Sequence, residues 1–198
     1  PLHQVRCSMA SSALADKRVK PTHIMTLDSD VLTPLDLLVR LVAHRLPVVA
    51  GLYYSRGKFA GKFDQTGEPH STYFPVMAYK ENEEEPWEVA AKESRWRSSS
   101  LYTDLMVVDG TGLGCMLVEA GVFAKLQKPW YNMPVSQDGE TVLCGEDYWF
   151  CDRLKQAGFE VIVDTTIEGI MHHCDGWVGA PGHLYDTADL MTGPEASQ

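Results

Sequence analysis

The sequence has 198 residues, of which 44% are hydrophobic and 22% charged, and its formal net charge is −10. This length and composition suit a globular domain with a substantial core. The negative charge argues against nucleic acid as a main partner, because binding to a phosphate backbone depends on clustered Lys and Arg. The longest apolar stretch, residues 46–54, is too short to span a bilayer, so no membrane span is expected.

Five cysteines are scattered along the chain, and none of them belongs to a C-x-x-C pair. Their odd number and irregular spacing favour reduced thiols over a disulfide framework. No amino-terminal signal pattern is visible either. We therefore expect a cytoplasmic protein.

The first part of the chain predicts a strand–helix–strand unit. Residues 3–19 are expected to form a helix with Val5, Met9 and Ala13 on its apolar face, and residues 22–28 a strand. A second helix is expected from Thr33, the capping residue, with Pro34 at the first helical position and a core stripe of Leu35, Leu38, Val42 and Leu46.

The apolar run at 47–54 predicts a strand that is buried on both faces. Together with the strand at 22–28 and the helix between them it forms a βαβ unit. Such a unit implies a parallel sheet, whose ligand crevice lies beyond the carboxyl ends of the strands.

Residues 56–104 are polar and rich in Gly, Lys, Glu and Ser. We expect a variable insertion here, within a single domain that covers residues 1–185. Inside the insertion, residues 73–79 predict a short strand at the edge of the sheet, and the acidic run at 81–85 predicts a solvated surface.

The remainder of the chain alternates again between apolar strands and amphipathic helices. The predicted strands are 105–109, 115–118, 159–164 and 166–171, and the predicted helices are 119–126 and 146–157. Residues 186–198 are expected to form a loosely ordered tail. The whole pattern predicts an α/β fold, with a mostly parallel sheet and helices on both sides.

Asp28 and Asp30 are the strongest candidates for chemistry. They end the strand at 22–28, and side chains two residues apart in extended chain point to the same side. Carboxylate oxygens suit Mg²⁺ or Mn²⁺, which proteins commonly hold with one or two carboxylates and substrate phosphates. The alternative is that Asp and Ser here only make a turn or cap a helix.

Two further clusters lie at the ends of predicted elements. Glu146 and Asp147 open a helix, where acidic side chains are favourable through the helix dipole without any catalysis. His172 and His173 end the last predicted strand, and alternation places them on opposite faces, so at most one faces a given site. A closed zinc site there lacks a second pair of ligands.

The order of these motifs resembles that of the GT-A glycosyltransferases, especially the family-2 type of bacteria, phages and their environmental relatives. The resemblance covers roughly residues 3–175, in the segments IMTLDSDV, VVAGLYYSR, VDGTGLGCMLVEAGVFAKL, PWY, GEDYWFCDRLKQAGFEVIVD and IMHH. It implies a Rossmann-like GT-A fold that is truncated at its amino terminus, since the βαβ segment that binds the nucleotide base in this family has no counterpart here.

The resemblance also implies an activity: transfer of a sugar from a nucleotide-diphosphate donor to a hydroxyl of a glycan, lipid or protein. Asp28 and Asp30 match the Asp-x-Asp motif that holds Mg²⁺ or Mn²⁺ on the donor diphosphate, and the resemblance favours Asp30 as the direct ligand. His172 or His173 matches a late histidine that completes the metal shell. Asp147 matches the general base of inverting members.

The resemblance also implies roles for residues other than the metal ligands and the base. Glu146 supports the base or binds the acceptor. The residues expected to bind donor or acceptor are Ser29, Gly112, Gly114 and Trp149.

Two other interpretations remain open. In a haloacid-dehalogenase-like phosphatase, Asp28 would be the nucleophile and Asp30 the acid/base, but such enzymes also need a later Lys and an acidic pair at a strand end, whereas residues 146–147 open a helix. A truncated domain that binds a sugar or a partner without turnover is the non-enzymatic alternative.

Overall fold

The computed structural model describes residues 1–29, 31–63, 69–87, 104–167, 171–174, 177–180 and 183–186. The helices are α1 (Leu2–Ala15), α2 (Leu37–Ala43), α4 (Ala120–Phe123) and α5 (Glu146–Gln156). The strands are β1 (His23–Leu27), β2 (Val31–Leu32), β3 (Val48–Gly51), β4 (Tyr54–Phe63), β5 (Pro69–Pro75), β6 (Met77–Ala78), β7 (Leu105–Val108), β8 (Gly110–Thr111), β9 (Cys115–Glu119), β10 (Val161–Asp164), β11 (Met171–Cys174), β12 (Trp177–Ala180) and β13 (His183–Asp186).

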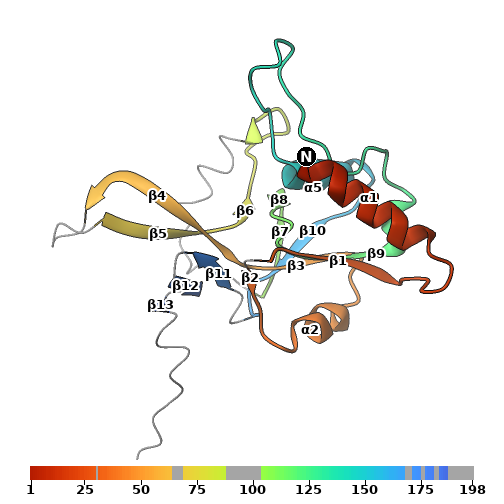
Figure 1. The fold of residues 1–198 in the computed structure, drawn as a ribbon, viewed down its shortest axis with the longest axis horizontal. Coiled ribbons are helices and arrows are strands. Elements are labelled where there is room, and N and C mark those ends of the chain that lie inside the picture. Colours follow the sequence, from red (N-terminus) through yellow and green to blue (C-terminus); the bar gives the residue numbers. More distant parts are fainter. Residues whose placement is uncertain are drawn as a thin grey trace, which may run out of the picture.

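A five-stranded sheet with the order β1-β9-β3-β10-β7 forms the centre of the fold (Figure 1). β3 and β10 pair in parallel, whereas the pairs β1–β9, β9–β3 and β10–β7 are antiparallel. The α/β class is therefore confirmed, but the mostly parallel sheet is wrong. β1 and β3 do run in the same direction on either side of α2, as a βαβ unit requires, yet β9 lies between them and pairs with both.

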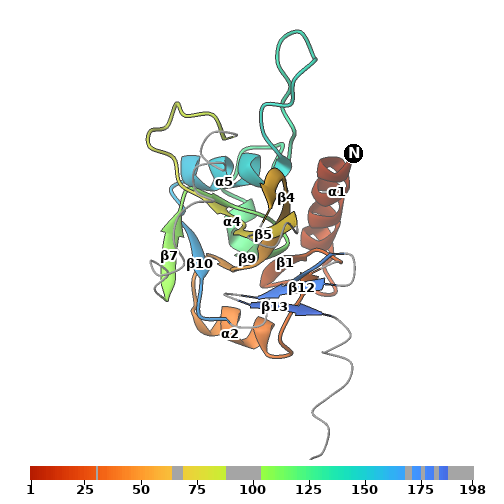
Figure 2. The ribbon, with the colours of Figure 1, turned by 90° about the vertical axis from the view of Figure 1, so that its left-hand side faces the viewer.

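Helices cover both faces of this sheet. Figure 2 shows α1 and α5 on one side and α2 on the other. Side chains of β3 point alternately to the two faces of the sheet, and both faces are covered, so the whole strand is apolar. Val48 and Ala50 belong to the core under α5, whereas Val49 belongs to the core that contains Leu37 and Leu41 of α2. All three β3 residues are fully buried.

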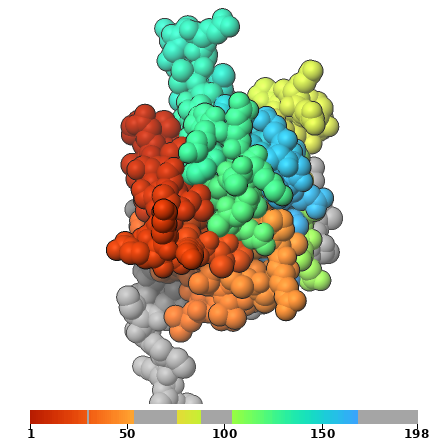
Figure 3. Space-filling model, turned by 90° about the vertical axis from the view of Figure 1, so that its right-hand side faces the viewer, coloured from red at the N-terminus to blue at the C-terminus, as the bar shows by residue number. Residues whose placement is uncertain are grey.

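The two amino-terminal helices bury other residues than their apolar spacing predicts. In α1 the inward face carries Arg6, Cys7 and Ala10, while Val5 and Met9 are 51% and 67% exposed. Figure 3 shows α1, in red, at the surface beside the green segment that includes α4.

In α2 the buried residues are Leu37 and Leu41, so the predicted stripe through Leu38 and Val42 is wrong. α2 also begins later than expected, at Leu37 and with Asp36 rather than Thr33 at its N-cap. Both helices are apolar on more than one side, and packing against the sheet decides which side is buried.

Smaller sheets surround the central one. β4 pairs with β5, β6 with β8, and β13, β12, β11 and β2 form a four-stranded sheet in that order. The 73–79 region therefore does not form the edge of the central sheet, whose outer strands are β1 and β7. Residues 81–84 of the acidic run are exposed, as expected.

The carboxyl-terminal part differs from the prediction in one respect. β10 ends at Asp164 and residues 165–167 are not in a strand, so that the two histidines lie within β11 instead of after a strand at 166–171. The predicted tail from 187 onwards lies outside the described residues, and the single domain over 1–185 stays a prediction. Among the helices described, none has the length and apolar character needed to cross a membrane.

Candidate functional site

Arg6 joins two of the predicted clusters. Its Nη2 donates a hydrogen bond to Oδ1 of Asp28 over 2.7 Å, and its Nε lies 3.6 Å from Oε1 of Glu146. The side chains of Arg6 and Glu146 are 14% and 15% exposed, whereas that of Asp28 is 38% exposed. Residues from α1, the end of β1 and the start of α5 thus meet at one place, which we call the acidic site (Arg6, Asp28, Glu146 and Asp147).

The backbone fixes Asp28 at the end of β1. Its N–H donates to the carbonyl of Gly114 over 3.1 Å, which extends the β1–β9 pairing beyond Leu27 and Cys115. Its carbonyl accepts a hydrogen bond from the N–H of Val31 over 3.2 Å, so the chain turns immediately afterwards. The carboxylate of Asp28 therefore sits where the strand leaves the sheet, as the sequence predicts.

Gly112 and Gly114 make room for a tyrosine next to Asp28. The N–H of Gly114 donates to the hydroxyl of Tyr53 over 3.1 Å. A Cβ built on Gly112 would lie 2.0 Å from that hydroxyl, and one built on Gly114 would lie 2.7 Å from it and 3.1 Å from Oδ2 of Asp28. Burial raises the pKa of Tyr53 far above its ordinary value, so the group stays a neutral hydroxyl beside the carboxylate.

Asp147 occupies an environment that disfavours its charge. Burial raises the pKa of its carboxyl to about 6, and the negative charge of Glu146 acts in the same direction. The hydrogen bond that Oδ1 accepts from the N–H of Tyr148 over 2.8 Å and the nearby Arg6 oppose this shift. A carboxyl with a pKa this close to neutrality is suited to general acid–base chemistry.

Asp147 does not act as a helix cap. The N-cap of α5 is Gly145, and no side chain caps the helix, although Glu146 and Asp147 both lie in its first turn. A Cβ on Gly145 would come within 2.5 Å of Oδ1 of Asp147. The carboxylate therefore folds back over the start of the helix, in a place that only glycine leaves open.

An aromatic pair lies next to the acidic site. The rings of Trp87 and Tyr148 stack with centroids 4.6 Å apart and planes 7° from parallel. Nε1 of Trp87 donates to Asp152 over 2.8 Å, and Nζ of Lys80 lies 4.4 Å from the centre of its ring. This pair holds the residue that follows Asp147 in place against Gly110, where a Cβ would be 2.7 Å from the Tyr148 ring.

The remaining predicted residues are placed less closely. Ser29 is exposed in the turn after Asp28. Nε1 of Trp149 donates to the carbonyl of Pro129 over 3.1 Å, and the guanidinium of Arg153 lies 4.2 Å from its ring centre. Neither of these contacts involves a residue of the acidic site. The binding roles of Ser29, Gly112, Gly114 and Trp149 stay predictions.

Of the other predicted metal ligands, the structure describes only the backbone of His172 and His173. Asp30 lies outside the described residues, as do the side chains of His172 and His173. The pairing of β11 with β2 sets His172 opposite Val31 and Met171 opposite Leu32. The chain of β11 thus runs directly beside the residues that follow the two predicted metal-binding carboxylates.

Among the predicted metal ligands, Asp28 is the one whose side chain the structure describes. In the described ranges no group of three or more His, Cys, Asp or Glu side chains lies close enough together to hold a metal ion. Asp28 supplies one half-exposed carboxylate. Mg²⁺ commonly keeps several waters and is held by one or two carboxylates together with substrate phosphates, so a site with few protein ligands is compatible with it.

Arg6, Tyr53 and Trp87 are the residues that sequence reasoning missed. Arg6 lies in a helix with no motif around it, and its role appears only when α1 packs beside β1 and α5. Tyr53 lies within the strand predicted at 47–54 and follows the end of β3, and the nearby glycines at 112 and 114 are the signal that a bulky group lies close to the backbone there.

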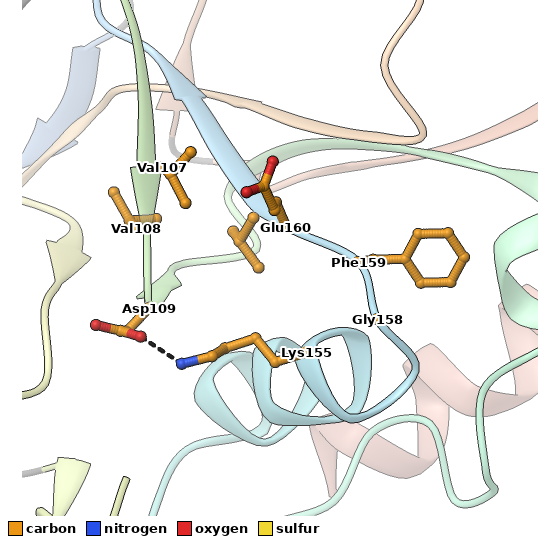
Figure 4. A pocket seen from close by; sticks show the side chains of 8 residues that line it. Val107, Val108, Asp109, Lys155, Gly158, Phe159 and Glu160 are labelled. Carbon is orange, nitrogen blue, oxygen red and sulfur yellow. Dashed lines mark hydrogen bonds and ion pairs between the residues drawn. The ribbon is translucent and has the colours of Figure 1, made fainter. Parts of the chain in front are cut away.

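Two hollows in the surface lie elsewhere. One, of about 310 Å³, lies at the carboxyl end of α5 between Val107, Gly158 and Glu160, and Figure 4 shows Lys155 reaching across to Asp109 at its rim. Their ion pair ties α5 to the end of β7. The other hollow, of about 380 Å³, is lined by Cys7, Ser11, Lys128, Pro129 and Trp130. Neither is lined by residues of the acidic site.

Comparisons with known proteins define the fold but not the family. No family model matches the sequence, and no curated protein matches it. Among solved structures, A197 from STIV superposes with a TM-score of 0.54 at 16% sequence identity, over 93% of this chain and 74% of that chain. The chain is therefore similar in fold to A197 from STIV.

Proposed function

We propose that the protein is a metal-dependent glycosyltransferase that moves a sugar from a nucleotide-diphosphate donor to an acceptor hydroxyl. The observation that carries this proposal is the contact of Arg6 with both Asp28 and Glu146. Arg6 thus joins Asp28, which is expected to serve the donor, to the acid pair at 146–147, which is expected to serve the acceptor. These groups are far apart in the sequence but lie in one site.

The chemistry assigned to Asp147 is proton abstraction. An acceptor hydroxyl must lose its proton as its oxygen attacks the anomeric carbon, and a positioned carboxylate promotes this step. With a pKa of about 6, Asp147 is mostly ionised at neutral pH and is a stronger base than an exposed aspartate. Glu146, held by Arg6, orients the start of α5, and no covalent intermediate with the protein is needed.

The chemistry assigned to Asp28 concerns the leaving group. Asp28 would hold Mg²⁺ or Mn²⁺ together with Asp30 and one of His172 and His173. When bound, such an ion supplies positive charge that stabilises the departing nucleoside diphosphate. The hydrogen bond from the N–H of Asp28 to the carbonyl of Gly114 keeps this residue at the end of β1, where its carboxylate is partly exposed to solvent.

The test is the release of nucleoside diphosphate from a panel of nucleotide sugars, with Mn²⁺ or Mg²⁺ and with simple glycosides as acceptors. Asp147→Asn should reduce the rate by about 10²-fold or more, the usual scale for a lost general base. Asp28→Asn should also reduce the rate, because it weakens binding of the ion that stabilises the leaving group. Asp138→Asn is the matched control, because Asp138 is exposed and lies in the loop between α4 and α5. It should leave the rate unchanged.

Other outcomes would favour the alternatives. Hydrolysis of an aryl phosphate that depends on Asp28 would indicate a phosphatase, although a nucleophilic Asp28 is hard to reconcile with its ion pair to Arg6. Binding of a nucleotide sugar without release of diphosphate, seen by calorimetry, would indicate a non-catalytic binding domain. Release by Asp147→Asn at the wild-type rate would contradict the assignment of the base.

A further inference from the structure

Arg6 already provides a positive charge at the position where the proposed function requires one. Its guanidinium lies 2.7 Å from Oδ1 of Asp28, and its side chain is only 14% exposed. An arginine stays charged at every accessible pH, so the carboxylate of Asp28 is neutralised by the protein itself in the absence of metal.

A divalent cation at Asp28 would conflict with this arrangement. An ion bound to the same carboxylate would lie within a few ångströms of the guanidinium, and like charges at this distance in a partly buried site repel each other strongly. Metal binding and the Arg6–Asp28 ion pair therefore compete for one carboxylate.

The structure also offers Arg6 a second partner. Nε of Arg6 is buried and has no hydrogen-bond partner among the described residues, and Oε1 of Glu146 lies 3.6 Å from it, just beyond hydrogen-bond distance. A small displacement of the guanidinium away from Asp28 and towards Glu146 would satisfy this buried donor. The cost of leaving Asp28 is thus offset by a bond that the present position does not make.

We propose that Arg6 is an internal counter-ion of the acidic site, which a divalent cation displaces from Asp28 and which then pairs with Glu146. This proposal rests on the metal dependence of the proposed function. It makes Arg6 a positioning residue that links occupancy of the donor side to the start of α5, where Asp147 lies.

The first experiment measures the affinity for Mn²⁺ alone by calorimetry. Arg6→Gln removes the competing charge and should tighten Mn²⁺ binding by roughly tenfold, a scale set by the loss of one nearby charge. Arg6→Lys keeps the charge and should bind Mn²⁺ about as the wild type does. Arg18→Gln is the matched control, since Arg18 is 90% exposed and pairs only with Asp16 among its described ion pairs.

The second experiment needs no variant, and so does not depend on whether Arg6→Gln folds. In ¹H–¹⁵N spectra of the wild-type protein, addition of Mg²⁺ should shift the Nε–H resonance of Arg6 and leave that of Arg18 in place. Assignment uses the Arg6→Lys spectrum, from which the Arg6 signal is missing.

The outcomes separate this proposal from the proposed function. Equal Mn²⁺ affinity of wild type and Arg6→Gln, or an Arg6 signal that saturating Mg²⁺ does not move, overturns the counter-ion proposal but leaves the metal-dependent transferase intact. Absence of Mn²⁺ binding in the wild type and in Arg6→Gln alike overturns both the metal dependence and the counter-ion. Tighter binding in Arg6→Gln alone, together with a shifted Arg6 signal, supports the proposal.

Discussion

The hydroxyl of Tyr53 occupies the space in which a side chain of residue 114 would begin. Its oxygen accepts the N–H of Gly114 over 3.1 Å, and a Cβ built on Gly114 would lie 2.7 Å from the same oxygen. Oδ2 of Asp28 is the next neighbour, 3.1 Å from that Cβ position. The end of β3, the approach to β9 and the end of β1 are therefore packed together around a glycine.

This packing predicts that Gly114→Ala is destabilising. The added methyl group would overlap the ring and hydroxyl of Tyr53, both of which are held in the core. We expect a loss of about 1–3 kcal/mol in the free energy of unfolding, measured in urea, as is typical of overpacked sites.

Gly121→Ala is the control for this experiment. Gly121 lies inside α4, and a Cβ there has nothing within 4 Å. Because alanine favours a helix over glycine, this variant should be as stable as the wild type or more stable by up to about 1 kcal/mol. A Gly114→Ala protein with wild-type stability would mean that Tyr53 can move aside at no cost.

The strands of the central sheet were predictable, but their order was not. The strands at β1, β3, β7, β9 and β10 all follow from short apolar runs. A run such as residues 48–51 is apolar because both of its faces are covered, and this holds equally for a parallel strand and for an antiparallel strand in the middle of a sheet. The insertion of β9 between β1 and β3 is a property of long-range pairing that no local pattern contains.

The site was predictable to the extent that its residues lie in motifs. Asp28, Glu146 and Asp147 stand at the ends of clear elements, and the structure brings them to one place. Arg6 was not predictable, because the apolar spacing of α1 points to the side of Val5 and Met9, which is in fact exposed. Which side of a short, mixed helix is buried depends on its neighbours rather than on its own sequence.

A second prediction concerns Asp164, which ends β10 and is 1% exposed. Its carboxylate accepts hydrogen bonds from Nε2 of His44 over 2.7 Å and from the N–H and Oγ1 of Thr166 over 2.8 and 2.7 Å. Asp164→Ala leaves these donors without a partner, so we expect a loss of at least about 2 kcal/mol in the free energy of unfolding at pH 7.

The shifted pKa of Asp164 determines how the stability of the protein changes with pH. Burial raises the pKa of Asp164, but the hydrogen bonds from Thr166 and His44 outweigh it, and the pKa lies below its usual value of 3.8. The stabilisation is therefore present above this value and is lost as the pH falls through the lower pKa of the folded protein. The free energies of unfolding of wild type and Asp164→Ala, measured in urea, should therefore differ less at pH 3 than at pH 7. Asp16→Ala, at an exposed pair, should unfold close to the wild type at both.

A third prediction separates two contacts of Trp87, the stack on Tyr148 and the hydrogen bond to Asp152. Trp87→Phe keeps a ring stacked on Tyr148 but removes the hydrogen bond to Asp152, and should cost about 1 kcal/mol in stability. Trp87→Ala removes both contacts from a residue that is 5% exposed, and should cost about 3–5 kcal/mol.

A double-mutant cycle with Asp152→Ala, which removes the acceptor, tests whether the hydrogen bond is the source of the smaller loss. If it is, Asp152→Ala should destabilise the wild type more than it destabilises Trp87→Phe, since the donor is already gone in that variant. Equal losses in both backgrounds would show that the contact between Trp87 and Asp152 contributes nothing to stability.

The last prediction is that Asp147→Asn stabilises the protein while it removes activity. Burial raises the pKa of Asp147 from 3.8 to about 6, so the folded state holds this proton more tightly than the unfolded state does. Its contribution to stability is then greatest below pH 4 and is lost as the pH rises through 6. Above pH 6 the ionised carboxylate costs about 1–3 kcal/mol, a range that allows for its partial exposure to solvent.

Asparagine has the same size and its Oδ1 can still accept the N–H of Tyr148, but it carries no charge. Thermal unfolding should therefore show Asp147→Asn above the wild type at pH 8, with the difference closing as the pH is lowered to 4. Asp138→Asn is the control of opposite sign, because a hydrogen bond from Ser136 lowers the pKa of Asp138 and no gain at pH 8 is expected. If Asp147→Asn is less stable than the wild type at pH 8, the site does not disfavour the charge. The raised pKa that recommends Asp147 as the base would then have to be abandoned.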